Sequence, residues 1–149
     1  MKHINRWIIL VLMLGSLLLS ACGPKAVSAT GEKVQPAQLE PIDGSDLKRV
    51  LLTEKAAERI NIQMAPVGAT EVNGVGRQVV PYAAVIYDTA GNTWVYTNPE
   101  PLTFVREPIV VAFIDGDQAV LLSEGLGSET RVVTVGVAEL FGAETGVSK

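Results

Sequence analysis

Apolar and polar residues are arranged in three different ways along this chain. Residues 7–19 (WIILVLMLGSLLL) form an uncharged apolar run, residues 23–45 hold three prolines and three glycines without an aromatic residue, and from residue 47 onward short apolar stretches alternate with turn-forming residues. The apolar run is shorter than the roughly 20 residues that a membrane-spanning helix needs. The second segment lacks the apolar residues for a core and predicts a flexible tether. The third segment has the pattern of β-strands.

The pattern after residue 46 predicts a mainly β fold, a small six-stranded β-barrel or roll with one or two short helices. Thr53 is a good N-cap for the first helix. Four regions are expected: a signal peptide over 1–21, a flexible, disordered tether over 22–45, the β domain over 46–142 and a tail over 143–149. The expected elements are a strand-like stretch at 47–52 and six strands at 60–64, 79–87, 93–97, 103–114, 118–122 and 131–135. A helix is expected at 54–59, a loop at 68–76 and a helical turn at 138–141.

The amino-terminal segment has the order of parts found in an export signal. Lys2 and Arg6 precede the apolar run, and the sequence LSAC at 19–22 follows it. That sequence resembles the bacterial lipobox, in which a cysteine is acylated before the signal is removed. We therefore expect lipid on Cys22 and an extracytoplasmic protein anchored to the cell membrane. The alternative interpretation is an ordinary signal peptide with a chance cysteine, or an uncleaved anchor.

Charge and residue content narrow the function further. Cleavage before Cys22 removes Lys2, His3 and Arg6 and leaves 10 basic and 16 acidic residues, a formal charge of −6. An acidic surface disfavours nucleic acid as a partner. His3 and Cys22 are the only residues of their kinds, so the processed chain would lack the imidazole and the free thiol that dominate catalytic and transition-metal chemistry. We therefore expect a non-catalytic protein without a cofactor or a metal.

Three aromatic residues are candidates for a partner interface. Trp94, Tyr96 and Phe104 lie in expected strands, and aromatic side chains dominate the binding energy of many protein interfaces. The alternative is that these rings fill the core or its rim, and it is favoured for at least two of the three. The two interpretations differ in the expected exposure of the rings.

Several segments, in order, resemble the membrane-proximal domain of periplasmic adaptor proteins, also called membrane fusion proteins, which serve RND-type efflux pumps. The likeness covers most of residues 48–142, and Asn61 stands where the family has a glycine. The matching segments are 52–67 (LTEKAAERINIQMAPV, against LTxxAxxxxGIxxAPV), 80–86 (VPYAAVI, against VPxxAVI), 91–96 with 104–111 (against GxxxVYV and FxRRPVxV), and 125–127 with 131–140 (against GLxxGxxVVxxGxxxL).

The chain also departs from that family. Full adaptors carry a long insertion with a β-barrel domain, a lipoyl-like domain and a helical hairpin, whereas only nine residues separate Val67 from Arg77 here. The resemblance therefore implies a reduced adaptor or accessory subunit that contacts an efflux-type membrane transporter at the extracytoplasmic face. The alternative is a free-standing envelope lipoprotein that binds a small ligand or another envelope component.

Overall fold

The computed structural model describes residues 35–122 and 124–146. The predicted signal peptide, Cys22 and the first part of the predicted tether lie outside these residues. The described chain is mainly β, with two sheets and two short α-helices, which confirms the predicted fold class. None of the helices in this part of the chain is long and apolar enough to cross a membrane.

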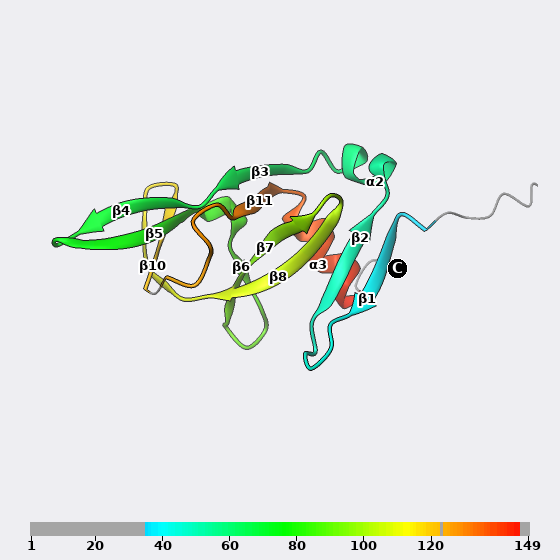
Figure 1. Ribbon diagram of the computed structural model, residues 1–149, viewed down its shortest axis with the longest axis horizontal. Coiled ribbons are helices and arrows are strands. Elements are labelled where there is room, and N and C mark those ends of the chain that lie inside the picture. The colour runs from blue at the N-terminus through cyan, green and yellow to red at the C-terminus, as the bar shows by residue number, and fades with distance from the viewer. Residues whose placement is uncertain (1–34, 123, 147–149) are drawn as a thin grey trace, which may run out of the picture. The chain divides into compact units, whose positions relative to one another are not determined.

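The strands form a seven-stranded and a four-stranded sheet (Figure 1). The larger sheet has the order β1-β2-β8-β7-β11-β3, with β6 paired to β7, and the smaller has the order β4-β5-β10-β9. The larger sheet comprises β1 (Ala37–Pro41), β2 (Lys48–Leu52), β3 (Gln63–Pro66), β6 (Ile86–Tyr87), β7 (Thr93–Glu100), β8 (Thr103–Ile109) and β11 (Arg131–Val135). The smaller comprises β4 (Gly68–Val72), β5 (Val75–Pro81), β9 (Val111–Asp115) and β10 (Gln118–Leu121).

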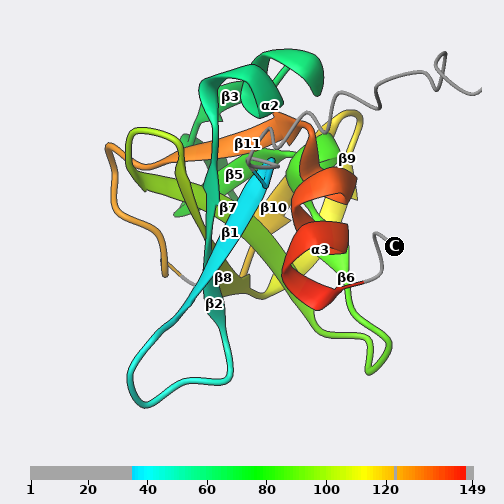
Figure 2. The ribbon, with the colours of Figure 1, turned by 90° about the vertical axis from the view of Figure 1, so that its right-hand side faces the viewer.

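Two hydrophobic cores lie on opposite faces of the larger sheet. Successive side chains of a strand point to opposite faces. Val95 therefore enters one core and Tyr96 the other, and Val132 and Val133 divide in the same way. The first core continues onto β5 and β10 of the smaller sheet, while helix α3 (Val137–Thr145) covers the second (Figure 2). Because both faces of β7 are covered, its central residues are fully buried.

Local sequence explains the helix boundaries. The Thr53 hydroxyl accepts a hydrogen bond from the Ala56 backbone N–H at 3.2 Å and begins helix α2 (Glu54–Arg59), as predicted. Asn61 follows with φ +51°, the left-handed conformation that glycine favours and that asparagine tolerates. Gly136 has φ +89° before α3, and a Cβ there would lie 2.5 Å from Ile62 Cδ1. Glycine is therefore needed at that position.

The structure corrects several predictions. Residues 68–76, predicted as a loop, contribute to the β4–β5 hairpin (Figure 1). Residues 37–41, predicted as tether, form β1 and pair with β2, so the ordered chain begins earlier than residue 46. Helix α3 extends to Thr145, so the predicted tail at 143–149 begins inside a helix. The described residues contain eleven strands instead of six, and of the predicted barrel or roll the closed barrel is not formed, because the strands lie in two separate sheets.

The segments on the two sides of the β4–β5 hairpin fold together. β2 pairs with β8, and β3 pairs with β11, so strands before the hairpin join strands after it in one sheet. The short 3₁₀ helix η2 (Tyr82–Ala84) interrupts the predicted strand at 79–87. This sheet positions the side chains of the candidate site.

Candidate docking groove around Trp94

Three polar side chains fix α3 against the larger sheet. The Tyr96 hydroxyl donates a hydrogen bond to Glu144 Oε2, and Arg106 Nη2 donates to Glu144 Oε1 at 3.1 Å. Glu144 is only 5% exposed, and the salt bridge to Arg106 compensates the charge of its carboxylate inside the protein. Burial, followed by the hydrogen bond to Glu144, raises the pKa of Tyr96, which keeps its hydroxyl a donor. We call these three residues the helix latch.

The Arg106 guanidinium also lies between two aromatic rings. Its central carbon is 4.6 Å from the centroid of the Trp94 ring and 5.4 Å from that of Phe141. Such contacts contribute roughly 0.5–2 kcal/mol, more where water is excluded. The guanidinium thus joins the helix latch to Trp94, and Arg106 Nε is left without a hydrogen-bond partner.

The turn before β7 holds the other edge of Trp94. Asp88 Oδ2 accepts hydrogen bonds from Trp94 Nε1 at 3.0 Å and from Asn92 Nδ2 at 2.8 Å, while Asp88 Oδ1 accepts from the backbone N–H groups of Ala90 and Asn92. These bonds, chiefly that from the Asn92 side chain, lower the pKa of Asp88 to about 2. The indole is therefore fixed both by a carboxylate and by a guanidinium.

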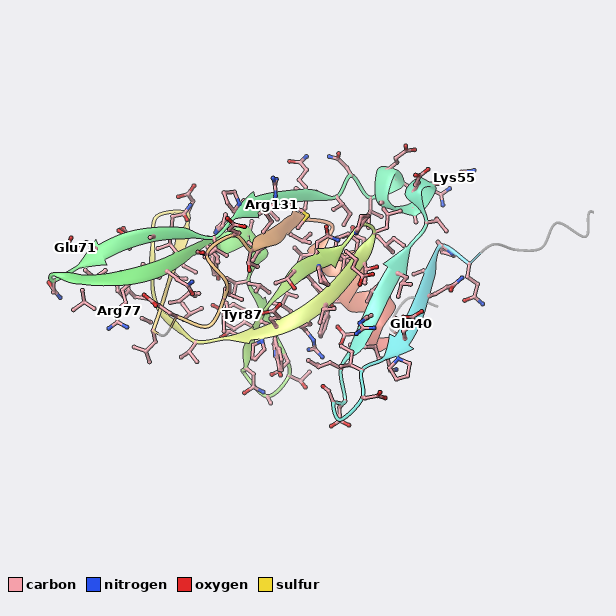
Figure 3. All side chains as sticks on the ribbon, in the orientation of Figure 1. Glu40, Lys55, Glu71, Arg77, Tyr87 and Arg131 are labelled. Atoms are coloured by element: carbon pink, nitrogen blue, oxygen red, sulfur yellow. The ribbon has the colours of Figure 1, made fainter. Side chains whose placement is uncertain are left out.

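Trp94 forms one wall of a shallow groove of about 490 Å³. We call this the Trp94 groove; it is lined by Trp94 with Gly91, Asn92, Thr93, Pro108, Ile109 and Val110. Val110 on its rim is 52% exposed. Tyr87, which pairs with Thr93 across β6 and β7, is equally exposed (Figure 3). A rigid aromatic ring with exposed apolar neighbours is suited to bind a protein side chain.

The structure separates the three aromatic residues predicted for an interface. Trp94 is partly exposed, whereas Tyr96 is fully buried and Phe104 is 3% exposed. The prediction of an exposed interface is therefore wrong for Tyr96 and Phe104, and the core alternative holds for both. They point into the core between the sheet and α3. The sequence did not predict the roles of Asp88 and Arg106, because both depend on where the Trp94 ring lies in the folded chain.

A second, polar groove of about 270 Å³ lies near the ends of β7 and β11. It is lined by Met64, Thr97, Asn98, Pro99, Glu107, Glu129, Thr130 and Arg131. Its volume is below the range of roughly 300–1,000 Å³ typical of small-molecule sites. Glu107 is engaged by the Thr97 hydroxyl at 2.7 Å. Across residues 35–122 and 124–146, no group of three His, Cys, Asp or Glu side chains could hold a metal ion.

Comparisons with protein-family models, with curated proteins and with solved structures give no match. The resemblance to periplasmic adaptors therefore rests on the sequence segments at 52–67, 80–86, 91–96, 104–111, 125–127 and 131–140. The geometry of the Trp94 groove is independent of that resemblance.

Proposed function

We propose that this chain is a non-catalytic, lipid-anchored protein that docks on the extracytoplasmic face of an efflux-type membrane transporter. The observation that carries the proposal is the Trp94 groove, in which a tryptophan is held by Asp88 and Arg106 beside an apolar rim. Fixing a side chain before binding lowers the entropy cost of association. Tryptophan is also among the residues most enriched in interface hot spots.

Two features of the sequence support the location of this contact. The lipobox-like sequence ending at Cys22 predicts a membrane anchor, and residues 23–34 offer at most a short span between that anchor and Gln35, the first residue that the structure describes. A tether of about 12 residues has a typical span of roughly 20 Å. Such an anchor keeps the groove close to the bilayer, where it raises the effective concentration of the chain near a membrane partner.

Site-specific photo-crosslinking in membranes tests the proposal. A photoreactive residue replaces Val110, on the rim of the groove, and in a matched variant replaces Val75 at the start of β5; both valines are 52% exposed. We expect a membrane transporter, identified by mass spectrometry, among the adducts from position 110 and not from position 75. Trp94→Ala should abolish the adduct while the circular dichroism spectrum stays β-type.

Two outcomes would contradict the proposal. The same adducts from both positions would indicate random collision at the membrane. Adducts that contain no transporter would contradict the proposed partner. A transporter adduct that still forms in a folded Trp94→Ala variant would show that the Trp94 groove is not part of the interface.

A further inference from the structure

Helix α2 lies beside the point where the described chain begins. The Thr53 backbone N–H, next to the helix, donates a hydrogen bond to the Pro36 carbonyl at 3.1 Å, so Pro36 lies beside the start of α2 (Figure 1). Only residues 23–34 separate Cys22 from Gln35. A segment of that length has a typical span of roughly 20 Å. A lipid anchor on Cys22 would therefore keep the α2 end of the fold close to the bilayer.

A groove of about 670 Å³ lies between α2 and this first part of the described chain. We call it the α2 groove; it is lined by Pro36, Thr53, Lys55, Ala56, Arg59 and Ile60. Ala56 and Ile60 are half-buried and pack against the second hydrophobic core. Lys55 and Arg59 are exposed (Figure 3). The α2 groove thus combines an apolar surface with two positive charges.

The charged residues of α2 are separated onto two sides of the helix. Lys55 and Arg59 are four residues apart, and residues at this spacing lie on the same side of a helix. Glu54 and Glu58 have the same spacing and lie on a different side. Neither glutamate lines the α2 groove, and Glu58 lines another groove instead. The side of α2 that faces the α2 groove is therefore positive.

Neither of the two cations is neutralised within the described fold. Across residues 35–122 and 124–146, the only salt bridge joins Arg106 to Glu144. Arg131, by contrast with the two cations of α2, donates a hydrogen bond to a backbone carbonyl. Like charges four residues apart repel each other and destabilise a helix. An anion bound between Lys55 and Arg59 would relieve that repulsion.

We propose that the α2 groove binds the headgroup of an anionic phospholipid, a proposal that rests on the lipid anchor of the proposed function. Lys55 and Arg59 bind the headgroup phosphate, and the apolar residues of the groove contact the glycerol and the first carbons of the acyl chains. Each cation close to an anionic bilayer is attracted to it. Two cations attract a free protein only weakly. The anchor supplies the affinity, and it presents headgroups to the groove at a high local concentration.

The charge of the whole chain favours one orientation at the membrane. The processed chain has a formal charge of −6, so an anionic bilayer repels most of its surface and attracts the α2 groove. The tether joins the fold beside the same groove. The anchor and the charges therefore direct the same end of the fold toward the bilayer, and this restricts the orientations in which the Trp94 groove can reach a transporter.

Fluorescence quenching of the full lipidated chain in vesicles tests the contact. A dye is attached to Gln35→Cys beside the α2 groove, or in a matched chain to Val75→Cys in the β4–β5 hairpin, which lies far from α2 (Figure 1). The vesicles contain phosphatidylcholine alone or mixed with phosphatidylglycerol, each with a trace of lipid that carries a nitroxide quencher on its headgroup. We expect phosphatidylglycerol to increase quenching of the dye at position 35 and not at position 75.

Two double variants separate the positive side of α2 from its negative side. Lys55→Gln combined with Arg59→Gln should shift the equilibrium away from the orientation with the groove at the bilayer by roughly ten- to thirtyfold, and quenching at position 35 should fall to the level in phosphatidylcholine. Glu54→Gln combined with Glu58→Gln is the matched control, and it should keep the increase caused by phosphatidylglycerol.

Three results would overturn the headgroup contact in an anchored chain. These are equal quenching in both kinds of vesicle, an increase that persists in the variant without Lys55 and Arg59, and loss of the increase when inorganic phosphate is added at constant ionic strength, since the groove would then bind a free anion. If the dye also labels Cys22, or the chain enters neither kind of vesicle, the lipid anchor of the proposed function is wrong, and the headgroup contact is overturned with it.

Discussion

Neutralising Glu144 should destabilise the protein strongly, because its partner Arg106 is buried with it. The Arg106 side chain is 13% exposed and that of Glu144 is 4% exposed. Glu144→Gln keeps the size of the side chain and a hydrogen-bond acceptor for Tyr96, but leaves the guanidinium charge uncompensated. Removing one partner of a buried ion pair typically costs 3–5 kcal/mol. Because the rings of Trp94 and Phe141 still stabilise the cation, we expect the lower end, about 3 kcal/mol.

Urea denaturation of the chain from Val34 onward measures this loss. Trp94, the only tryptophan in that part of the sequence, packs against Arg106 and reports unfolding by fluorescence. A loss of about 3 kcal/mol corresponds to a fall in Tm of roughly 12 °C for a domain of this size. Glu139→Gln, at an exposed position of the same helix, is the matched control and should change stability by less than about 0.5 kcal/mol.

A second substitution should restore the stability that Glu144→Gln removes. Adding Arg106→Met to Glu144→Gln removes the unbalanced charge and fills the space with an apolar side chain, so the double variant should regain much of the lost stability. If Glu144→Gln is no more destabilising than Glu139→Gln, the ion pair does not hold α3 to the sheet. A double variant less stable than Glu144→Gln would refute the charge argument.

Three further changes test other parts of the structure. The pKa of Asp88 is lowered to about 2, so the stabilisation of its turn should be complete above about pH 4 and lost as the pH falls through 2. The NMR signal of the Trp94 indole N–H should follow this loss. In the Asp88→Asn variant, that signal should not change with pH between about 4 and 2. Gly136→Ala forces a Cβ into the left-handed conformation and against Ile62, and thermal unfolding should show a loss of more than about 1 kcal/mol. Cys22→Ser should release the protein from membranes or leave it uncleaved, as cell fractionation will show; unchanged fractionation would contradict the lipid anchor.

Signals that act between close neighbours predicted much of the fold. Thr53 begins a helix where it was expected, and Asn61 adopts positive φ because its short polar side chain tolerates that conformation. The β4–β5 hairpin was missed, although Asn73-Gly74 is the usual signal for a tight hairpin; both residues have positive φ. The three glycines of residues 68–76 obscured that signal, since glycine also favours loops.

The candidate site depended on contacts between distant residues, which the sequence did not predict. The hydroxyl of Tyr96 meets Glu144 across 48 positions, and Arg106 meets it across 38. Side chains alternate between the two faces along β7, which directs Tyr96 toward α3. Its partner Glu144 is determined only by how α3 packs on the sheet. Trp94 was identified by its residue type, while the groups that hold it, Asp88 and Arg106, required the structure.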